Sequence, residues 1–411
     1  MLAPRQWSHR PYHLFPALQA CQPTALRLHT MEFDFTWILL GLPIAFTLGW
    51  LASRADLRQL RLENRQAPKA YFKGLNYLLN EQQDQAIDAF IEAVQIDPDT
   101  SELHFALGNL FRRRGEYERA VRVHEHLLSR GDLAQPERDR AQQALALDYL
   151  KAGLLDRAET ALRKLEGTPY EQDAYLSLLS IYERSRDWPN ATEIASKLDK
   201  ASPGSFMVRQ SHYLCEQAAM ALAGGETQTA LLVLQQAVTI APSHPRPRID
   251  LANLYLQMNQ HEQALSSLAE LEKMAPQAFP LACPPLVTIA QEPSMRAPVL
   301  DLLHIHHVHT PSVDVMEALV RLNLDPDLAR RHYLEHLEHE VSLVAAARWI
   351  SGEKLVSEQN QMLLQRALDK ATKPLMRYRC AACGFEASQH FWHCPGCQAW
   401  DSYPARRIEE L

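Results

Sequence analysis

A small residue recurs through the middle of this chain at the spacing of a helical repeat. Six alanines are separated by 34, 38, 33, 39 and 34 residues: Ala86, Ala120, Ala158, Ala191, Ala230 and Ala264. A tyrosine stands nine residues before several of them, as at Tyr149, Tyr182 and Tyr255. A period near 34 is typical of a unit of two antiparallel helices that buries its apolar face only by stacking on its neighbours. The period therefore predicts an α-solenoid.

The first unit shows the pattern in most detail. From Ala70 the chain reads AYFKGLNYLLNEQQDQAIDAFIEAVQIDPD, and six positions match the signature of a tetratricopeptide repeat: Gly74, Tyr77, Ala86, Phe90, Ala93 and Pro98. The small residues let the two helices approach closely, the aromatic rings fill the space between them, and the proline ends the second helix. Gly108 follows Gly74 after 34 residues. We expect six tetratricopeptide repeats in residues 67–277.

Beyond residue 277 the period becomes irregular. Residues 312–322, 326–344 and 358–371 still show helical patterns, so we expect divergent helical repeats over residues 278–373. Only 14 of 411 residues are glycine, which favours helices, and the predicted fold class is mainly α. The formal net charge of −7 argues against nucleic acid as a partner. The chain carries no nucleotide-binding, zinc-protease or serine-hydrolase motif, so we expect no enzymatic activity.

The N-terminal region contains an uncharged apolar stretch. Residues 35–53 read FTWILLGLPIAFTLGWLAS, which is long enough to cross a bilayer as one transmembrane helix. Basic residues crowd the segment that follows, residues 54–66, and this bias places the C-terminal bulk in the cytoplasm. Residues 1–30 hold no acidic residue. They fit an over-long gene start or, less well, a transit-like extension, and in both cases we expect them to be unstructured.

The C-terminus combines two cysteine pairs. The spacing Cys380-x2-Cys383-x10-Cys394-x2-Cys397 brings four thiolates to one ion, and four sulfurs complete a tetrahedral site. We expect one structural metal ion, zinc in preference to iron, in a small domain over residues 376–411. His390 and His393 are competing ligands that this arrangement does not need.

Other polar residues give weaker signals. In a repeat array the first helix of each pair lines a groove, where amides and guanidinium groups can hold a peptide. The candidates for such contacts are Asn109, Arg112, Arg113, Arg246 and Asn253. Two groups of histidines could bind a metal or sense pH, although packing or surface roles are more common for such residues: His304, His306, His307 and His309, and His332, His336 and His339.

The order of these parts resembles the lipopolysaccharide assembly protein B family. An N-terminal span, a basic juxtamembrane segment, tetratricopeptide repeats and a rubredoxin-like metal domain occur in that order. The most specific stretch runs from Tyr378-Arg379-Cys380 to Trp392-His393-Cys394-Pro395 and Trp400. The resemblance covers residues 31 to about 407, and residues 1–30 depart from it.

This resemblance implies a regulator of lipopolysaccharide biosynthesis in the cell inner membrane. Such an adaptor promotes degradation of the deacetylase LpxC, which commits cells to lipid A synthesis, by the membrane AAA+ protease FtsH. Other inner-membrane lipopolysaccharide regulators are implied as partners, and the repeat surfaces could support a homo-oligomer. Two alternatives stay open: a general assembly scaffold for lipopolysaccharide synthesis and export proteins, and a redox protein that uses iron.

Overall fold

The structure is a computed structural model that describes residues 35–323, 325–353 and 358–411. For residues 35–40, 54–68 and 358–359 it describes the backbone only. The prediction for residues 1–30 lies outside the described residues. The chain divides into two compact units between Phe72 and Lys73, and each unit is described by itself.

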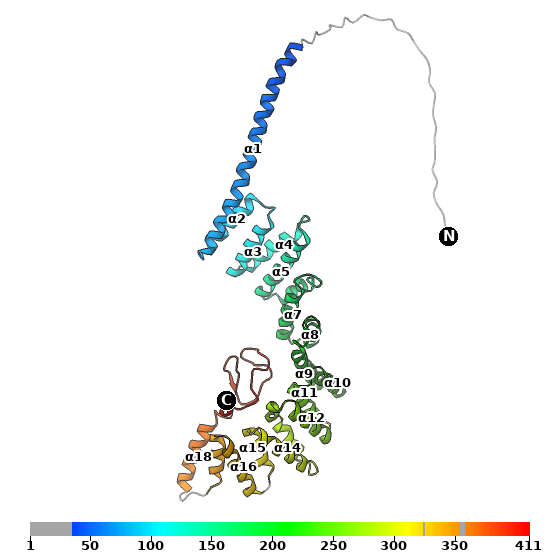
Figure 1. The fold of residues 1–411 in the computed structure, drawn as a ribbon, viewed down its shortest axis with the longest axis vertical. Coiled ribbons are helices and arrows are strands. Elements are labelled where there is room, and N and C mark those ends of the chain that lie inside the picture. The colour runs from blue at the N-terminus through cyan, green and yellow to red at the C-terminus, as the bar shows by residue number, and fades with distance from the viewer. Residues whose placement is uncertain (1–34, 324, 354–357) are drawn as a thin grey trace, which may run out of the picture. The chain divides into compact units, whose positions relative to one another are not determined.

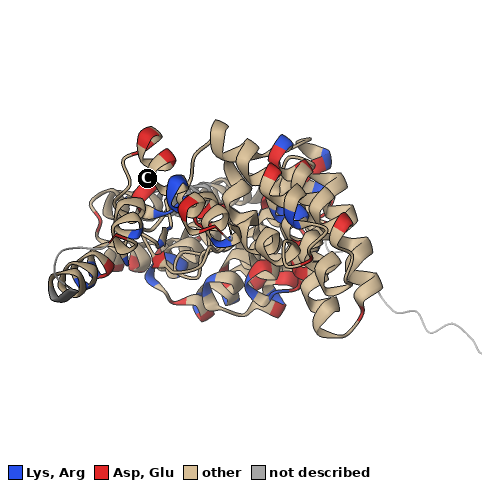
Figure 2. Cartoon of the chain, turned by 90° about the horizontal axis from the view of Figure 1, so that it is seen from below, with Lys and Arg blue, Asp and Glu red and all other residues tan. Residues whose placement is uncertain are grey.

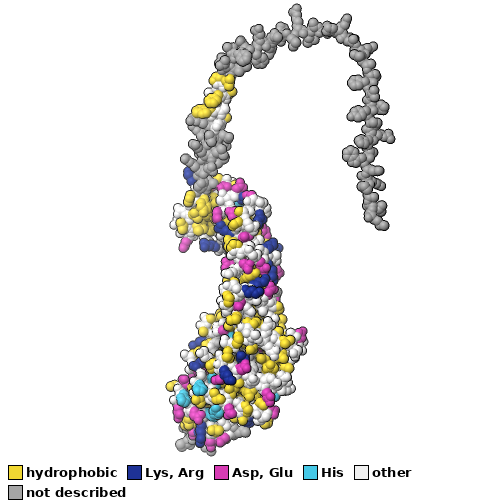
Figure 3. All heavy atoms as spheres, turned by 45° about the vertical axis from the view of Figure 1, so that its right-hand side comes forward, with side chains coloured by type: hydrophobic (Ala, Val, Ile, Leu, Met, Phe, Trp, Pro, Cys, Tyr) yellow, Lys and Arg dark blue, Asp and Glu magenta, His cyan; other side chains and the backbone are white. Residues whose placement is uncertain are grey.

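Helix α1 runs from Phe35 to Leu79, so the predicted span 35–53 and the segment 54–66 are both helical. Every described side chain from 41 to 53 is exposed, and Figure 3 shows hydrophobic side chains along this part of the helix. The large apolar ones are Leu42, Ile44, Phe46, Leu48, Trp50 and Leu51. The side chains of residues 35–40 lie outside the described part. Among the residues that are described, no helix combines the length and the apolar character needed to cross a membrane.

Antiparallel helix pairs form the array (Figure 1). The end of α1 packs with α2 (Gln83–Ile96). The next pairs are α3 (Ser101–Arg114) with α4 (Tyr117–Ser129), α5 (Gln135–Ala152) with α6 (Leu155–Arg163), and α7 (Glu171–Ser185) with α8 (Trp188–Ala201). They are followed by α9 (Met207–Ala223) with α10 (Thr227–Ile240), and α11 (Pro245–Gln257) with α12 (His261–Met274).

The small residues of the repeat lie where the helices of a pair approach most closely. All six periodic alanines are fully buried. A Cβ atom added to Gly74 would lie 2.9 Å from Phe90, and one added to Gly108 would lie 2.5 Å from His124. These distances leave no room for a side chain, so the close approach explains why small residues recur at this position.

Two tyrosines of the pattern, Tyr149 and Tyr182, connect successive repeats. The hydroxyl of Tyr149 on α5 donates to Glu125 on α4 at 2.7 Å, and that of Tyr182 on α7 donates to Glu159 on α6 at 2.7 Å. Each ring is buried in the core while its hydroxyl reaches a carboxylate at the surface. The same residue type therefore fills the core and ties one helix pair to the preceding one.

Helical structure continues after α12, as the sequence predicts. The elements are η1 (Pro276–Ala282), α13 (Cys283–Ile289), α14 (Arg296–His309), α15 (Val313–Leu322), α16 (Pro326–His339), α17 (Leu343–Ser351) and α18 (Glu358–Thr372). The single helix expected over 326–344 is wrong, because α16 ends at His339. The Ser342 side chain accepts a hydrogen bond from the Ala345 N–H and begins a new helix there.

The C-terminal segment is mostly irregular. Strands β1 (Tyr378–Arg379) and β2 (Glu386–Ala387) form a two-stranded antiparallel sheet, and η2 (Ile408–Glu410) lies at the end of the chain. Figure 2 shows acidic and basic residues interspersed along the ribbon of the chain. The expected mainly α class, with a repeat solenoid and a small C-terminal domain, is confirmed.

Candidate metal centre and its docking site

Two similar turns carry the cysteine pairs. In the first, the Cys380 N–H donates to Phe385 O at 2.9 Å and the Gly384 N–H to Cys380 O at 2.9 Å. In the second, the Cys394 N–H donates to Ala399 O at 3.0 Å and the Gln398 N–H to Cys394 O at 2.8 Å. The residue after each second cysteine is left-handed, with φ +77° at Gly384 and +59° at Gln398. This shared geometry turns the two cysteines of each pair towards the same point.

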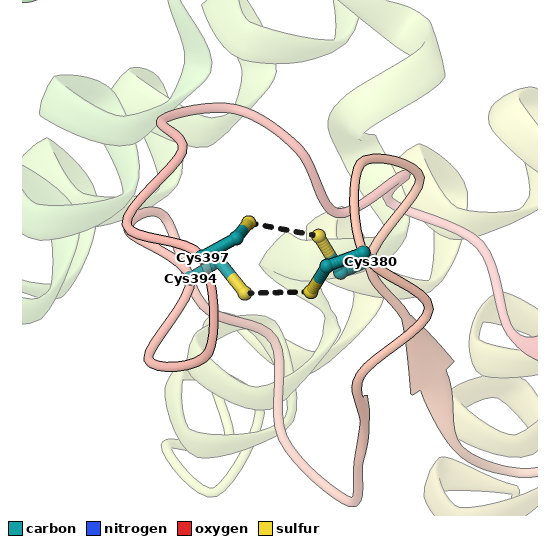
Figure 4. Close-up of side chains that lie close together, drawn as sticks. Cys380, Cys394 and Cys397 are labelled. Carbon is teal, nitrogen blue, oxygen red and sulfur yellow. Dashed lines mark hydrogen bonds between the residues drawn. The ribbon is translucent and has the colours of Figure 1, made fainter. Parts of the chain in front are cut away.

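The four sulfur atoms face one another across the two turns (Figure 4). All lie within 4.8 Å of one another, with Cys380 Sγ 3.8 Å from Cys397 Sγ and Cys383 Sγ 3.7 Å from Cys394 Sγ. A tetrahedral zinc site with Zn–S bonds of about 2.3 Å places its sulfurs about 3.8 Å apart. The cysteines therefore fit a tetrahedral metal ion, and all four positions would be filled by the protein.

Backbone N–H groups surround the more buried sulfur of each pair. Desolvation raises the pKa of the Cys380 thiol. Hydrogen bonds from the Ser402 hydroxyl and from the Cys383 and Ala382 N–H groups outweigh it and lower the pKa to about 6. At Cys394 the N–H groups of Cys397 and Gly396 also lower the pKa against desolvation. These donors favour thiolates, which are the form that binds a metal.

The two neighbouring histidines have other contacts. His390 Nε2 lies 3.1 Å from Tyr403 O, and His393 Nε2 lies 2.9 Å from Gln398 O. Both imidazole rings therefore hydrogen-bond to the backbone of the domain, and the sulfurs alone form the cluster.

Asp401 connects this domain to the repeat array. One carboxylate oxygen lies 2.8 Å from His212 Nε2 on α9, and the other lies 3.4 Å from His244 Nε2 at the start of α11. The Arg246 guanidinium donates to His212 Nδ1 at 3.3 Å. Since Nδ1 accepts this bond, Nε2 carries the proton of the neutral ring and donates it to Asp401. This protonation also argues against a metal between the two histidines and Asp401, because a metal would need the lone pair of Nε2.

Aromatic rings pack around this polar contact. Trp400 lies 4.6 Å from the His212 ring, 6.0 Å from Tyr213 and 6.2 Å from Trp188, measured between ring centroids. Its indole N–H donates to Glu183 Oε1 on α7 at 3.2 Å. The metal domain is thus docked on helices α7, α8, α9 and α11 through one carboxylate and one tryptophan.

The end of the chain makes a second docking contact, on α15 and α17. Arg407 pairs with Asp314 at 2.8 Å, and the Tyr378 hydroxyl donates to the same carboxylate at 3.3 Å. Burial and the Asp314 charge raise the pKa of Tyr378, which keeps its phenol protonated as the donor.

Two successive glutamates cap helix N-termini in this second contact. The Val313 N–H of α15 donates to Glu410 at 2.9 Å. The Val344 N–H and the Ser342 hydroxyl of α17 donate to Glu409 at 2.9 and 2.8 Å. Carboxylates are favoured at helix N-termini by the free N–H groups and the helix dipole.

The five candidate groove residues have different environments in the structure. Arg112 donates to the buried Asp148 at 2.8 Å and to Asn109 at 2.5 Å, so both residues take part in contacts within the array. Arg246 is buried beneath the metal domain, where it pairs with Glu216 at 2.7 Å. Arg113 and Asn253 are exposed.

The two histidine groups meet between α14 and α16. His304 lies 5.1 Å from His332 and His307 lies 5.7 Å from His336, measured between ring centroids. Burial and the neighbouring His336 lower the pKa of His307 to about 4. Figure 3 shows histidine side chains gathered towards the C-terminal end of the array. Among the described residues their nitrogen atoms do not converge as the cysteine sulfurs do.

Sequence analysis did not identify the residues that dock the metal domain. Asp401 directly follows Trp400 in the sequence, but a single aspartate gives no sign of its partner. His212 and His244 stand outside both histidine-rich segments. Glu409 and Glu410 look like ordinary charges of a chain end. None of these contacts follows a regular spacing, so no pattern could have revealed them.

Known protein families match the repeat array and the metal domain separately. Residues 378–403, which include all four cysteines, match the family described as Rubredoxin metal binding domain. Residues 70–100, 103–139, 144–206 and 221–282 match families described as Tetratricopeptide repeat. Lipopolysaccharide assembly protein B of Escherichia coli is 28% identical over 385 residues, which cover 91% of this chain and 99% of that protein. The resemblance to the lipopolysaccharide assembly protein B family is confirmed.

A second relative supports the same family. Lipopolysaccharide assembly protein B of Haemophilus influenzae is 27% identical over 387 residues, which cover 89% of this chain and 96% of that protein. Among solved structures, a tetratricopeptide repeat protein from Parabacteroides merdae matches 64% of this chain and 100% of its own, with 15% identity and a TM-score of 0.32. The similarity to lipopolysaccharide assembly protein B thus extends over both the repeats and the metal domain.

Proposed function

We propose that this protein is an adaptor of lipopolysaccharide assembly that is anchored in the inner membrane and has no catalytic activity of its own. It holds the deacetylase LpxC on its repeat array and promotes degradation of LpxC by the protease FtsH. The observation that carries this proposal is the match to lipopolysaccharide assembly protein B over 99% of that protein's length. Repeat arrays of this kind act as scaffolds for other proteins.

We propose that the docked metal domain forms a rigid part of the surface with which the array binds its partners. Cys380, Cys383, Cys394 and Cys397 would hold one structural ion, zinc in preference to iron. The ion would supply a cross-link between the two turns, and with four protein ligands it would have no open position for chemistry. Asp401 and Trp400 then hold the cross-linked domain on the helices. Loss of the ion should release this surface.

Membrane anchorage is also part of the proposal. Six large apolar side chains between Leu42 and Leu51 are exposed on α1, where water would solvate them poorly. Burial of this stretch in a bilayer, with the bulk of the chain on the cytoplasmic side, would confine the adaptor to the membrane of its protease. Confinement raises the effective concentration of one partner for the other. Fractionation of cells that express the chain with and without residues 35–53 tests the anchor.

The decisive measurement is the half-life of LpxC. In an Escherichia coli strain that lacks its own lipopolysaccharide assembly protein B, LpxC is followed after translation is stopped, with this chain or an empty vector. We expect the chain to shorten the half-life only when FtsH is present, and the Cys394→Ser variant to lose this effect. An unchanged half-life with a stably expressed chain would overturn the proposal and favour a general assembly scaffold.

A further inference from the structure

A surface pocket lies between the metal domain and the repeat array. Arg184, Arg186 and Trp188 line it from α7 and α8, and Phe391, His393 and Pro395 line it from the metal domain. Because the two walls come from parts of the chain that meet only by docking, this pocket is complete only while Asp401 and Trp400 hold the domain in place.

The charge available in the pocket is positive. Within the described part of the chain, the side chains of Arg184 and Arg186 have no hydrogen-bond or ion-pair partner, and both are exposed. The two carboxylates in the lining already have partners. Glu183 accepts bonds from Tyr213 and Trp400, and Glu216 pairs with Arg246 at 2.7 Å. Two arginines are therefore free to bind an anion.

Arg186 lies at the C-terminal end of α7 in the left-handed conformation, with φ +58°. The corresponding helix ends of other repeats are left-handed as well, with glycine at Gly115 and Gly153 and a residue with a Cβ atom at Glu81 and Asn259. The turn is therefore a common feature of the repeat, and here it places an arginine at the edge of the pocket.

We propose that this pocket binds an acidic peptide segment in which carboxylates alternate with large apolar side chains. The guanidinium groups of Arg184 and Arg186 can each form two hydrogen bonds to a carboxylate. Phe391 and Pro395 supply an apolar wall for an aromatic or aliphatic side chain. An extended peptide presents both kinds of group on alternate sides, which fits a pocket with one charged and one apolar wall. The inference rests on the proposed adaptor function and gives the chemistry of the segment it holds.

Fluorescence anisotropy tests the proposal with the full, metal-loaded chain in detergent micelles. The probe is a fluorescein-labelled nonapeptide with blocked ends that alternates glutamate with leucine and phenylalanine. One comparison peptide has lysine in place of glutamate, and another has alanine in place of the apolar residues. We expect the acidic apolar peptide to bind at least about tenfold more tightly than either of them, and more weakly as salt is added.

Variants of the chain locate the binding site. The double change Arg184→Glu and Arg186→Glu should weaken binding at least about tenfold, with unchanged metal content and helicity. Arg321→Glu, a change of the same charge at an exposed position on α15, should leave binding unchanged. Asp401→Asn should weaken binding while the metal stays bound, because the wall formed by Phe391 and Pro395 is no longer held in place.

Three results would overturn the inference: equal binding of the lysine peptide, binding unaffected by the charge reversal, or displacement of the peptide by phosphatidylglycerol added to the micelles. The last would indicate a lipid headgroup site instead. A chain that shortens the LpxC half-life but binds no acidic peptide would disprove the pocket and leave the proposed function standing. Binding of the acidic peptide without an effect on the LpxC half-life would support the pocket and disprove the proposed function.

Discussion

Replacing Asp401 by asparagine exchanges one carboxylate oxygen for an NH2 group at the contact between the metal domain and the array. In the folded protein two imidazole N–H groups, those of His212 and His244, point at the two carboxylate oxygens. Asparagine has one oxygen that can accept one of these bonds. Its NH2 group would face the other imidazole N–H, so a donor would meet a donor.

The magnitude follows from the burial of the groups involved. A hydrogen bond to a charged group contributes about 1.5–3 kcal/mol, and a buried donor left without an acceptor costs about 1–3 kcal/mol. His212 is fully buried, whereas the Asp401 side chain is 40% exposed, so the lower half of these ranges applies. We expect Asp401→Asn to weaken docking by about 2 kcal/mol, which corresponds to about a 30-fold larger undocked population.

Hydrogen exchange measured by mass spectrometry can follow this change. The Val313 and Val344 amides donate to Glu410 and Glu409, and they lose these acceptors when the C-terminal segment leaves the array. Peptides that contain these amides should exchange faster in the variant by about the same factor. Metal content should stay unchanged, because Asp401 is not one of the four ligands.

A matched control separates docking from a general effect of charge. Asp88→Asn removes the same charge at an exposed position on α2 and should leave exchange unchanged. Equal exchange rates in Asp401→Asn and the unaltered chain would refute the reasoning, since they would show that the two imidazole bonds do not hold the domain.

Three further predictions concern the metal, the packing and the pH dependence. Cys394→Ser should abolish stoichiometric metal binding and make residues 376–411 sensitive to protease, as metal analysis and limited proteolysis would show; a protected domain without metal would contradict the structural role of the ion. Gly108→Ala should lower the free energy of unfolding in urea by about 1–3 kcal/mol, because its Cβ would lie 2.5 Å from His124. Gly131→Ala, with nothing within 4 Å, serves as its control, and equal losses would count against the close approach. Burial lowers the pKa of His212 to about 4, against 6.5 in the unfolded chain, so the unfolded state binds the extra proton between these values. Stability should therefore fall as pH decreases from 6.5 to 4, by about 3 kcal/mol from this group, and urea titrations of His212→Gln should show a shallower fall.

The repeats could be predicted because their packing is local. Ala86 and its counterparts are fully buried, and their spacing of about 34 residues follows the succession of helix pairs. The cysteine cluster could be predicted for a related reason, since two short turns bring all four sulfurs together within 18 residues. The boundary at Ser342 could not be predicted in the same way. An apolar pattern continues across it, and the hydrogen bond from the Ser342 hydroxyl to Glu409 comes from a residue 67 positions away.

The sequence by itself determined the class of fold, the repeat unit and the cysteine cluster, because each depends on contacts between residues close in the chain. Only the tertiary structure decided which contacts those parts make with one another. It placed Arg112 and Arg246 in internal ion pairs, although their positions on the first helix of a repeat made them groove candidates. It brought Asp401 to His212 across 189 residues and thereby docked the metal domain on the array. Such contacts depend on how far the solenoid has turned after several repeats, and that accumulated rotation leaves no periodic trace in the sequence.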